Sequence, residues 1–222
     1  MKKFFKSVQL FAIMLVAGTS ICFTACSDDD DVVIKNPDEV TAEIMYGVYT
    51  GTMTTSYLAT VDGEDNGQET EPGIEISATI DDNTIRFEKF PIRDIVLSIV
   101  GDETSADEIV DAVGDVDYSI SYEPTLTPEK DRILMTLNPE PLKLTVEMPA
   151  SQESADAQTL IVEVLIEAGE QAGYNVEEAN VKFSIVATKV MLGEGDEQQE
   201  LGDFVATTFQ FDMNQCYVAH NF

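Results

Sequence analysis

The chain has 222 residues, and its 42 acidic and 12 basic side chains give a formal net charge of −30 at pH 7. Affinity for phosphate comes from Lys and Arg, so nucleic acid and anionic lipid surfaces are poor partners and we expect no nucleic-acid binding. One histidine and three cysteines are too few for the usual zinc sites, and no metal or other cofactor is predicted.

Residues 1–25 have the layout of a secretory signal peptide. Lysines at positions 2, 3 and 6 precede an apolar stretch at residues 8–16, and small and polar residues follow from Ala17. A membrane-spanning helix needs about 20 apolar residues, more than this stretch supplies. The pattern therefore predicts a segment that directs export and is then removed.

The end of this segment reads Phe23-Thr24-Ala25-Cys26. It resembles the lipobox of bacterial lipoproteins, with Phe23 where the common pattern has Leu, and the resemblance implies that Cys26 is acylated and becomes the new N-terminus. The run Asp28–Asp31 that follows resembles the surface-export signal of lipoproteins in Bacteroides-like bacteria; its alternative reading is a solvated acidic spacer. We expect a lipid-anchored outer-membrane protein exposed at the cell surface.

Residues 26–40 are predicted to be an acidic tether, and residues 41–222 a single β-rich domain. Losing Lys2, Lys3 and Lys6 with the signal would leave nine basic against 42 acidic residues, a net charge of −33. The mature domain would keep one unmodified cysteine, Cys216, which is expected to be a small buried hydrophobe.

Alternation of apolar and polar residues predicts strands through most of the domain. The clearest hairpin joins residues 74–80 to 85–87 through the turn Asp81-Asp82-Asn83. Within it, Ile76 is expected to face the core and Ser77 the solvent. Further strands are predicted at residues 116–122, 142–148, 160–167, 181–187 and 209–213, with weaker patterns at 48–58 and 132–137.

Helical spacing interrupts this alternation once. Pro91 precedes Ile92, Ile95, Val96 and Ile99 at helical spacing before Gly101 ends the run. A second short helix is predicted from a cap at Ser105 to Val113. The chain is therefore expected to be mainly β, an antiparallel β-sandwich or partly open β-barrel of about eight or nine strands with one or two short helices.

The segment Tyr46-Gly47-Val48-Tyr49-Thr50-Gly51, with the later Phe87-Glu88-Lys89-Phe90-Pro91, resembles uncharacterised lipoprotein domains of Bacteroides-like bacteria. Some of these have calycin-like barrels, in which a Gly-x-Tyr or Gly-x-Trp near the first strand plugs one barrel end. The helical segment after Pro91 departs from a simple up-and-down barrel. The resemblance implies no activity and no catalytic residues.

No catalytic constellation is predicted. A catalytic triad would have to use the lone histidine, His220, but the sequence has no Gly-x-Ser-x-Gly motif to supply the nucleophilic serine. A Cys–His pair of Cys216 and His220 is not expected, because this segment runs into a terminus that is prone to fray. Asp62–Gly67 begins like a calcium loop, but Gly73 stands where an EF-hand needs Glu, so this segment and Glu194–Glu200 are predicted to be exposed acidic loops. Gly patterns for nucleotide phosphates are absent.

The favoured hypothesis is a non-enzymatic domain that binds or scaffolds an extracellular ligand or protein, held to the membrane by its lipid. One alternative is an extracellular hydrolase that uses two carboxylates, favoured if two acids converge in a cleft. Another is a surface-fibre assembly subunit, favoured if the sheet leaves an unpaired edge strand.

Overall fold

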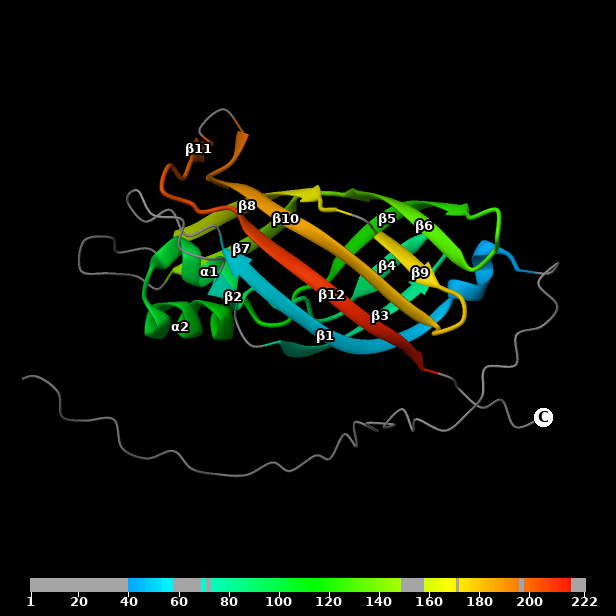
Figure 1. Ribbon diagram of the computed structural model, residues 1–222. Coiled ribbons are helices and arrows are strands. Elements are labelled where there is room, and N and C mark those ends of the chain that lie inside the picture. Colours follow the sequence, from blue (N-terminus) through cyan, green and yellow to red (C-terminus); the bar gives the residue numbers. More distant parts are fainter. Residues whose placement is uncertain are drawn as a thin grey trace, which may run out of the picture. The chain divides into compact units, whose positions relative to one another are not determined.

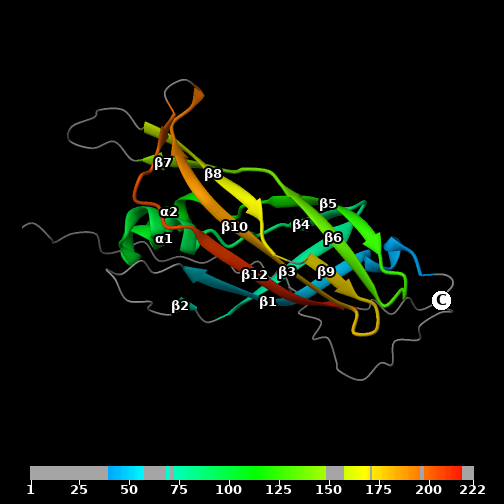
Figure 2. The same cartoon turned by 45° about the horizontal axis from the view of Figure 1, so that its top comes forward.

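A computed structural model describes residues 40–57, 69–70, 73–148, 158–170, 172–195 and 198–216. All of them belong to one compact unit, Asp31–Phe222. Its strands form one antiparallel sheet that curls around an aromatic core (Figures 1 and 2).

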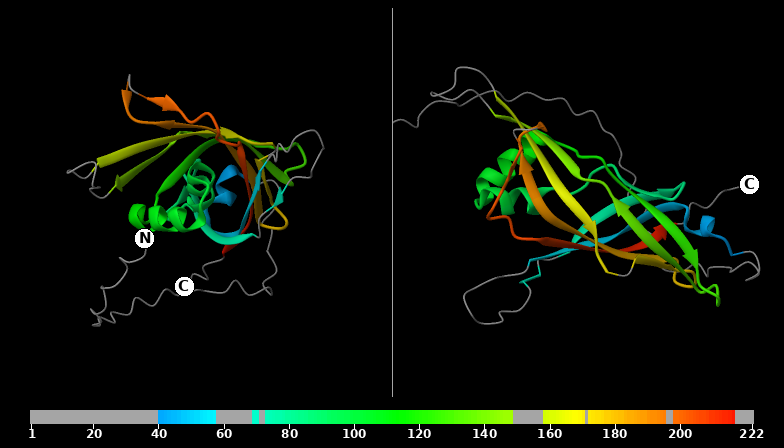
Figure 3. Two further views of the ribbon diagram at one scale, coloured as in Figure 1. Left: turned by 90° about the vertical axis from the view of Figure 1, so that its left-hand side faces the viewer. Right: turned by 90° about the horizontal axis from the view of Figure 1, so that it is seen from above.

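Eight of the strands close into a barrel in which spatial order follows sequence order. β12 pairs with β1 on one side and with β10 on the other, so the sheet meets itself and closes the ring (Figure 3). The eight strands are β1 (Gly47–Tyr57), β3 (Ile74–Asp81), β4 (Thr84–Phe87), β5 (Tyr118–Leu126), β6 (Arg132–Pro139), β9 (Ala172–Asn175), β10 (Asn180–Leu192) and β12 (Thr207–Cys216).

Four further strands lie outside this ring. β2 (Glu69–Thr70) pairs with β1, and β11 (Gln199–Glu200) pairs with the end of β10. β8 (Gln158–Ala168) pairs with the second half of β10, and β7 (Leu142–Met148) pairs with β8. β7 and β8 therefore extend the sheet beyond the barrel as a two-stranded ribbon (Figure 1).

Two helices cover the barrel end from which this ribbon extends. α1 (Arg93–Val100) buries Ile95 and Val96 and ends at Gly101, whose φ of 67° suits glycine. α2 (Glu103–Val113) packs against β7. Its N-cap is Asp102, which accepts a 2.8 Å hydrogen bond from the Ser105 backbone N–H. The prediction of Ser105 as the cap was therefore wrong, because a carboxylate three residues earlier reaches the free N–H.

The opposite barrel end is closed by a short 3₁₀ helix, η2 (Ala42–Met45). Met45 is fully buried, and its carbonyl accepts a 2.7 Å hydrogen bond from the hydroxyl of Tyr49, which is also fully buried. Tyr49 is the tyrosine of the Gly47-Val48-Tyr49 motif, so this motif lies at the closed end.

Every predicted strand that falls on described residues is present, and both predicted helices are present. The open choice between a sandwich and a partly open barrel is decided by the β10–β12 pairing, which makes the barrel closed. The strand that escaped prediction within the ring is β9, a four-residue strand rich in small residues, Ala172-Gly173-Tyr174-Asn175. It lacks the apolar alternation on which the sequence argument depends.

Candidate functional site

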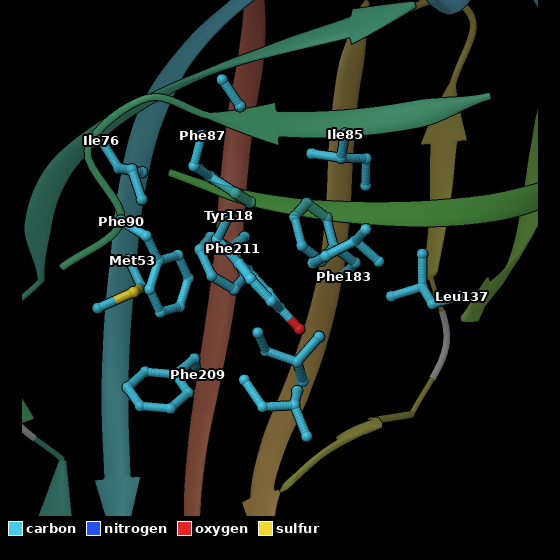
Figure 4. Close-up of a cluster of buried hydrophobic side chains, with 14 of the residues drawn as sticks. Met53, Ile76, Ile85, Phe87, Phe90, Tyr118, Leu137, Phe183, Phe209 and Phe211 are labelled. Atoms are coloured by element: carbon cyan, nitrogen blue, oxygen red, sulfur yellow. The ribbon is translucent and has the colours of Figure 1, made fainter. Parts of the chain in front are cut away.

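Aromatic side chains fill the barrel interior. Phe183 and Phe211 stack at 4.5 Å between ring centroids, Phe87 lies 5.3 Å from Phe211, and Phe90 lies 5.0 Å from Tyr118. These rings come from β4 and the residues just after it, from β5, from β10 and from β12, and they point toward one another (Figure 4). Eight-stranded barrels are just wide enough for side chains to fill, and here the interior is a packed core. The outer wall is therefore the surface that remains for ligand contacts.

A hollow lies on that outer wall, where β6, β9 and β10 run side by side. It has a volume of about 620 Å³, and we call it the outer-wall cleft. The strand register brings Arg132, Asn175 and Asn180 into one row across the three strands, and Leu134, Gly173 and Lys182 into the next. These six residues line the cleft, together with Glu178 from the β9–β10 turn.

The cleft has two causes in the sequence. Gly173 carries no side chain between Leu134 and Lys182, which leaves the second row hollow at its centre. In addition, β6 and β9 stop pairing after Met135 and Ala172, and the pairing resumes only at Leu142 and Val164 between β7 and β8. The segment that leads from β6 to β7 therefore separates from the segment that leads from β8 to β9 beside the cleft.

The polar end of the cleft is organised by Asn180, which is 6% exposed although it faces outward. Its amide nitrogen donates to Asp212 Oδ1 at 2.9 Å, to Asn214 Oδ1 at 2.9 Å and to the Met213 carbonyl at 3.1 Å. Asp212 also forms a 2.7 Å ion pair with Lys182. The hydrogen bond to Asp212 and the charge of Asp212 hold the pKa of Lys182 above the ordinary lysine value.

Arg132 is the basic group of the cleft that is left for a ligand. Six basic side chains in the described ranges form ion pairs: Arg86, Lys89, Arg93, Lys143, Lys182 and Lys189. The guanidinium of Arg132 forms none with the described residues, although its backbone N–H donates to Thr127 Oγ1 at 3.2 Å. Leu134, the residue two positions further along the strand, is 51% exposed. The cleft thus joins a guanidinium to an apolar surface.

A smaller groove of about 410 Å³ continues across β10, β12 and β1 and shares Lys182 with the outer-wall cleft. Two acids, Glu170 and Asp212, line it together with Thr52 and Thr54. Burial acts to raise the pKa of Asp212, but hydrogen bonds from Lys182 and Asn180 and the charge of Lys182 outweigh it, so this pKa lies below the usual range. Asp212 is therefore an ionised acceptor at neutral pH.

Of the residues singled out from the sequence, those that the structure describes line neither hollow. Cys26, residues 26–39 of the predicted tether, Asp62–Gly67 and His220 lie outside the described residues. Val40, the last residue of the predicted tether, is 8% exposed and packs in the core, so the domain begins there. Cys216 is half-buried, with its Sγ 3.3 Å from Thr50 Oγ1, so the prediction that it is buried was wrong: it faces outward at the end of β12. Glu194 is in an exposed loop, but Gln199 and Glu200 form β11, so the loop prediction there was only partly right.

Within the part of the chain that the structure describes, no group of three or more His, Cys, Asp or Glu side chains could hold a metal ion. In the same part, none of the helices has both the length and the apolar character needed to cross a membrane. Sequence analysis did not identify four polar residues of the cleft: Arg132, Asn175, Asn180 and Lys182. Polar residues that alternate along a strand have the pattern of an ordinary solvent-exposed face. The isolated Gly173 in a strand was the available signal.

Comparison with known proteins places the chain in a family. No curated protein and no solved structure gives a significant match. The model of one family, described as a domain of unknown function (DUF4840), matches residues 44–192, which run from η2 to the end of β10. Because this match covers more than half of the chain, the protein belongs to the DUF4840 family.

Proposed function

We propose that this protein is a cell-surface lipoprotein, anchored to the outer membrane through Cys26, whose barrel is a non-enzymatic binding domain. One observation carries the binding role: the barrel interior is filled, whereas the outer wall carries a cleft of about 620 Å³. Ligand sites commonly measure about 300–1,000 Å³ and combine apolar walls with a few polar groups. The lipid anchor and the surface location rest on the signal, the lipobox and Asp28–Asp31.

The chemistry of the cleft favours a small ligand that carries a carboxylate and an apolar part. A guanidinium can bind a carboxylate through two parallel hydrogen bonds, and Arg132 has no ion pair with the described residues. The exposed side chain of Leu134 offers an apolar contact on the same strand. Lys182 is less suited to this role because Asp212 already neutralises it.

The alternative of a carboxylate-based hydrolase has weaker support. The smaller groove does bring Glu170 and Asp212 together. However, a general acid needs a raised pKa, and the pKa of Asp212 is lowered by its lysine and asparagine partners. We therefore favour binding over hydrolysis.

Octanoate is a suitable probe, because it has one carboxylate and one apolar chain, and octanamide is its uncharged counterpart. We expect calorimetric titration to detect octanoate binding and a weaker response to octanamide. Arg132→Met should weaken octanoate binding by about tenfold or more, the loss expected when a charged hydrogen bond is removed. Lys130→Met, in the adjacent turn, is the matched control and should bind like the wild type.

A second variant tests whether octanoate binds in the cleft, by filling the cleft with a larger side chain. Gly173→Ile would place a side chain in the centre of the cleft, and an added Cβ would meet only the Ile133 carbonyl oxygen, at 3.3 Å. It should block binding without unfolding the barrel, whereas Ser119→Ile, on the exposed face of β5, should leave binding unchanged. Absence of octanoate binding, or equal binding by all variants, would contradict the proposed ligand class.

A further inference from the structure

β7 ends the sheet and leaves one edge open. In the described ranges β7 pairs with β8, and no described strand lies on its other side. The ribbon that carries it extends beyond the barrel, with β7 on its outer side (Figures 2 and 3). An exposed edge strand presents N–H and C=O groups that can pair with another chain.

The ladder fixes which backbone groups face the open edge. Ile161 of β8 accepts a 2.9 Å hydrogen bond from Gly193 N–H, so its backbone groups point away from β7. Thr145 lies opposite Ile161. In an antiparallel pair such residues do not bond to each other, so the N–H and C=O of Thr145 point to the open edge. By the same alternation, residues 143 and 147 also present their backbone groups there.

One face of β7 is apolar and buried, and the other is polar and exposed. Leu142, Leu144 and Val146 are buried on the face that α2 covers. Thr145 is exposed on the other face, where the side chain of Lys143 is 71% exposed. A partner strand must therefore present apolar residues on one face and polar residues on the other, in register with these.

We propose that β7 pairs antiparallel with β7 of a second copy of this chain, about a twofold axis at Thr145. The sequence Leu142-Lys143-Leu144-Thr145-Val146-Glu147-Met148 is self-complementary in this register. Lys143 of each copy stands opposite Glu147 of the other, Leu144 opposite Val146, and Thr145 opposite Thr145. Opposite charges in directly facing positions stabilise a strand pair.

Charge also selects this register over its neighbours. The backbone N–H and C=O groups of residues 143, 145 and 147 face the open edge. They can pair with the same groups of a second copy only in registers that differ by two residues or a multiple of two. Centring the pair on residue 144 would place Lys143 opposite Thr145, and centring it on residue 146 would place Glu147 opposite Thr145, so both of these registers lose the Lys–Glu pairs. Centring it on residue 143 would place Lys143 opposite Lys143, and centring it on residue 147 would place Glu147 opposite Glu147. Like charges that face each other directly are destabilising, so the register centred on Thr145 is the favoured one. This specificity makes a second copy, rather than an unrelated strand, the fitting occupant.

Disulfide trapping in the full chain tests this register. Thr145→Cys should form an oxidised dimer, because residues in a facing bonded pair have Cα atoms about 5.5 Å apart, within disulfide range. Lys143→Cys alone should not, because two copies of residue 143 would lie about 14 Å apart along the strands at about 3.4 Å per residue. Mixing Lys143→Cys with Glu147→Cys should restore cross-linking. The variants are made with Cys216→Ser, and this parent shows any background from Cys22 and Cys26 on a non-reducing gel.

Thr145→Pro gives a second readout without cysteine. It removes an N–H that faces the open edge and takes no part in the β7–β8 ladder, so the fold should survive. Sedimentation should show the wild type as a dimer and this variant as a monomer, and added NaCl should strengthen the wild-type dimer by screening the net charge of −30 per copy. A monomeric wild type, or cross-linking of Lys143→Cys alone as strong as that of Thr145→Cys, would overturn the proposal.

Discussion

Thr55 on β1 donates a hydrogen bond of 2.5 Å to Asp94 Oδ2 in the first turn of α1. Thr55 is 2% exposed, and this contact ties the helical segment to the barrel wall. Thr55→Val keeps the shape of the side chain but leaves the carboxylate without this donor. A hydrogen bond to a charged group contributes about 1.5–3 kcal/mol, so we expect a loss of that order in the free energy of unfolding in urea.

Thr52→Val is the control, because Thr52 lies on the same strand and is exposed. Its effect should stay within about 0.5 kcal/mol, as expected of a surface substitution. Equal losses in both variants would show that the link between Thr55 and Asp94 does not stabilise the barrel.

Two buried tyrosines on β5 should respond oppositely to loss of their hydroxyls. The Tyr118 hydroxyl donates a 2.7 Å hydrogen bond to the Glu140 carbonyl, whereas the buried Tyr122 hydroxyl has no hydrogen-bond partner among the described residues. Tyr118→Phe should therefore destabilise the protein by about 1 kcal/mol, and Tyr122→Phe should leave it equally or more stable. Urea unfolding at pH 7 distinguishes the two, and a larger loss for Tyr122→Phe would contradict the assignment.

The same residues predict a loss of stability at alkaline pH. Burial, followed by the neighbouring Tyr46 and the carboxylate of Asp81, raises the pKa of Tyr122 to about 12, and burial followed by Glu140 also raises the pKa of Tyr118. The unfolded chain loses these protons near pH 10. The folded state thus binds them more tightly, and this stabilisation is complete below about pH 10 and disappears as pH rises toward about 12. Melting temperatures should fall over that range, and Tyr122→Phe should make the fall shallower.

Aspartate substitutions on opposite faces of two strands should have opposite outcomes. Ile76 and Val146 are buried, at 7% and 8% exposure, while their neighbours Ser77 and Thr145 are exposed. Ile76→Asp and Val146→Asp should lower the melting temperature severely or prevent folding, because an unpaired charge would enter the core. Measured at protein concentrations low enough to keep the chain monomeric, Ser77→Asp and Thr145→Asp should melt near the wild type. Similar shifts in all four would contradict the assignment of faces.

Anchoring and surface display can be separated by two variants of the N-terminal segment. Cys26→Ala should prevent acylation, so the protein should leave the membrane fraction or accumulate as precursor. Replacing Asp28–Asp31 with Ala keeps Cys26 and should keep the lipid. If the acidic run directs export to the surface, this variant should stay membrane-bound but resist protease added to intact cells.

The wild type is the reference for that experiment and should be cut on intact cells. If the Ala variant is cut equally, the acidic run is a spacer and the surface assignment loses its main support. A wild type that resists protease until the cells are lysed would place the protein on an inward-facing leaflet.

The sequence by itself determined the elements that depend on local chemistry. Alternation identified β3, β7 and β12 and their buried faces, and the spacing from Pro91 to Gly101 identified α1. Such patterns are readable because side-chain direction repeats every two residues in a strand and every 3.6 residues in a helix. The lipobox at Cys26 belongs to the same class of local signal, and it remains a prediction.

Only the tertiary structure decided closure and the site. Whether β12 would meet β10 depends on residues far apart in the chain, because closure requires a matched register around the whole ring. Arg132 and Lys182 come together only because β9 lies between their strands, and the gap there depends on Gly173. A glycine in a short strand has the same local appearance whether its neighbours crowd it or leave it open, so the cleft follows from pairing across strands that no local pattern records.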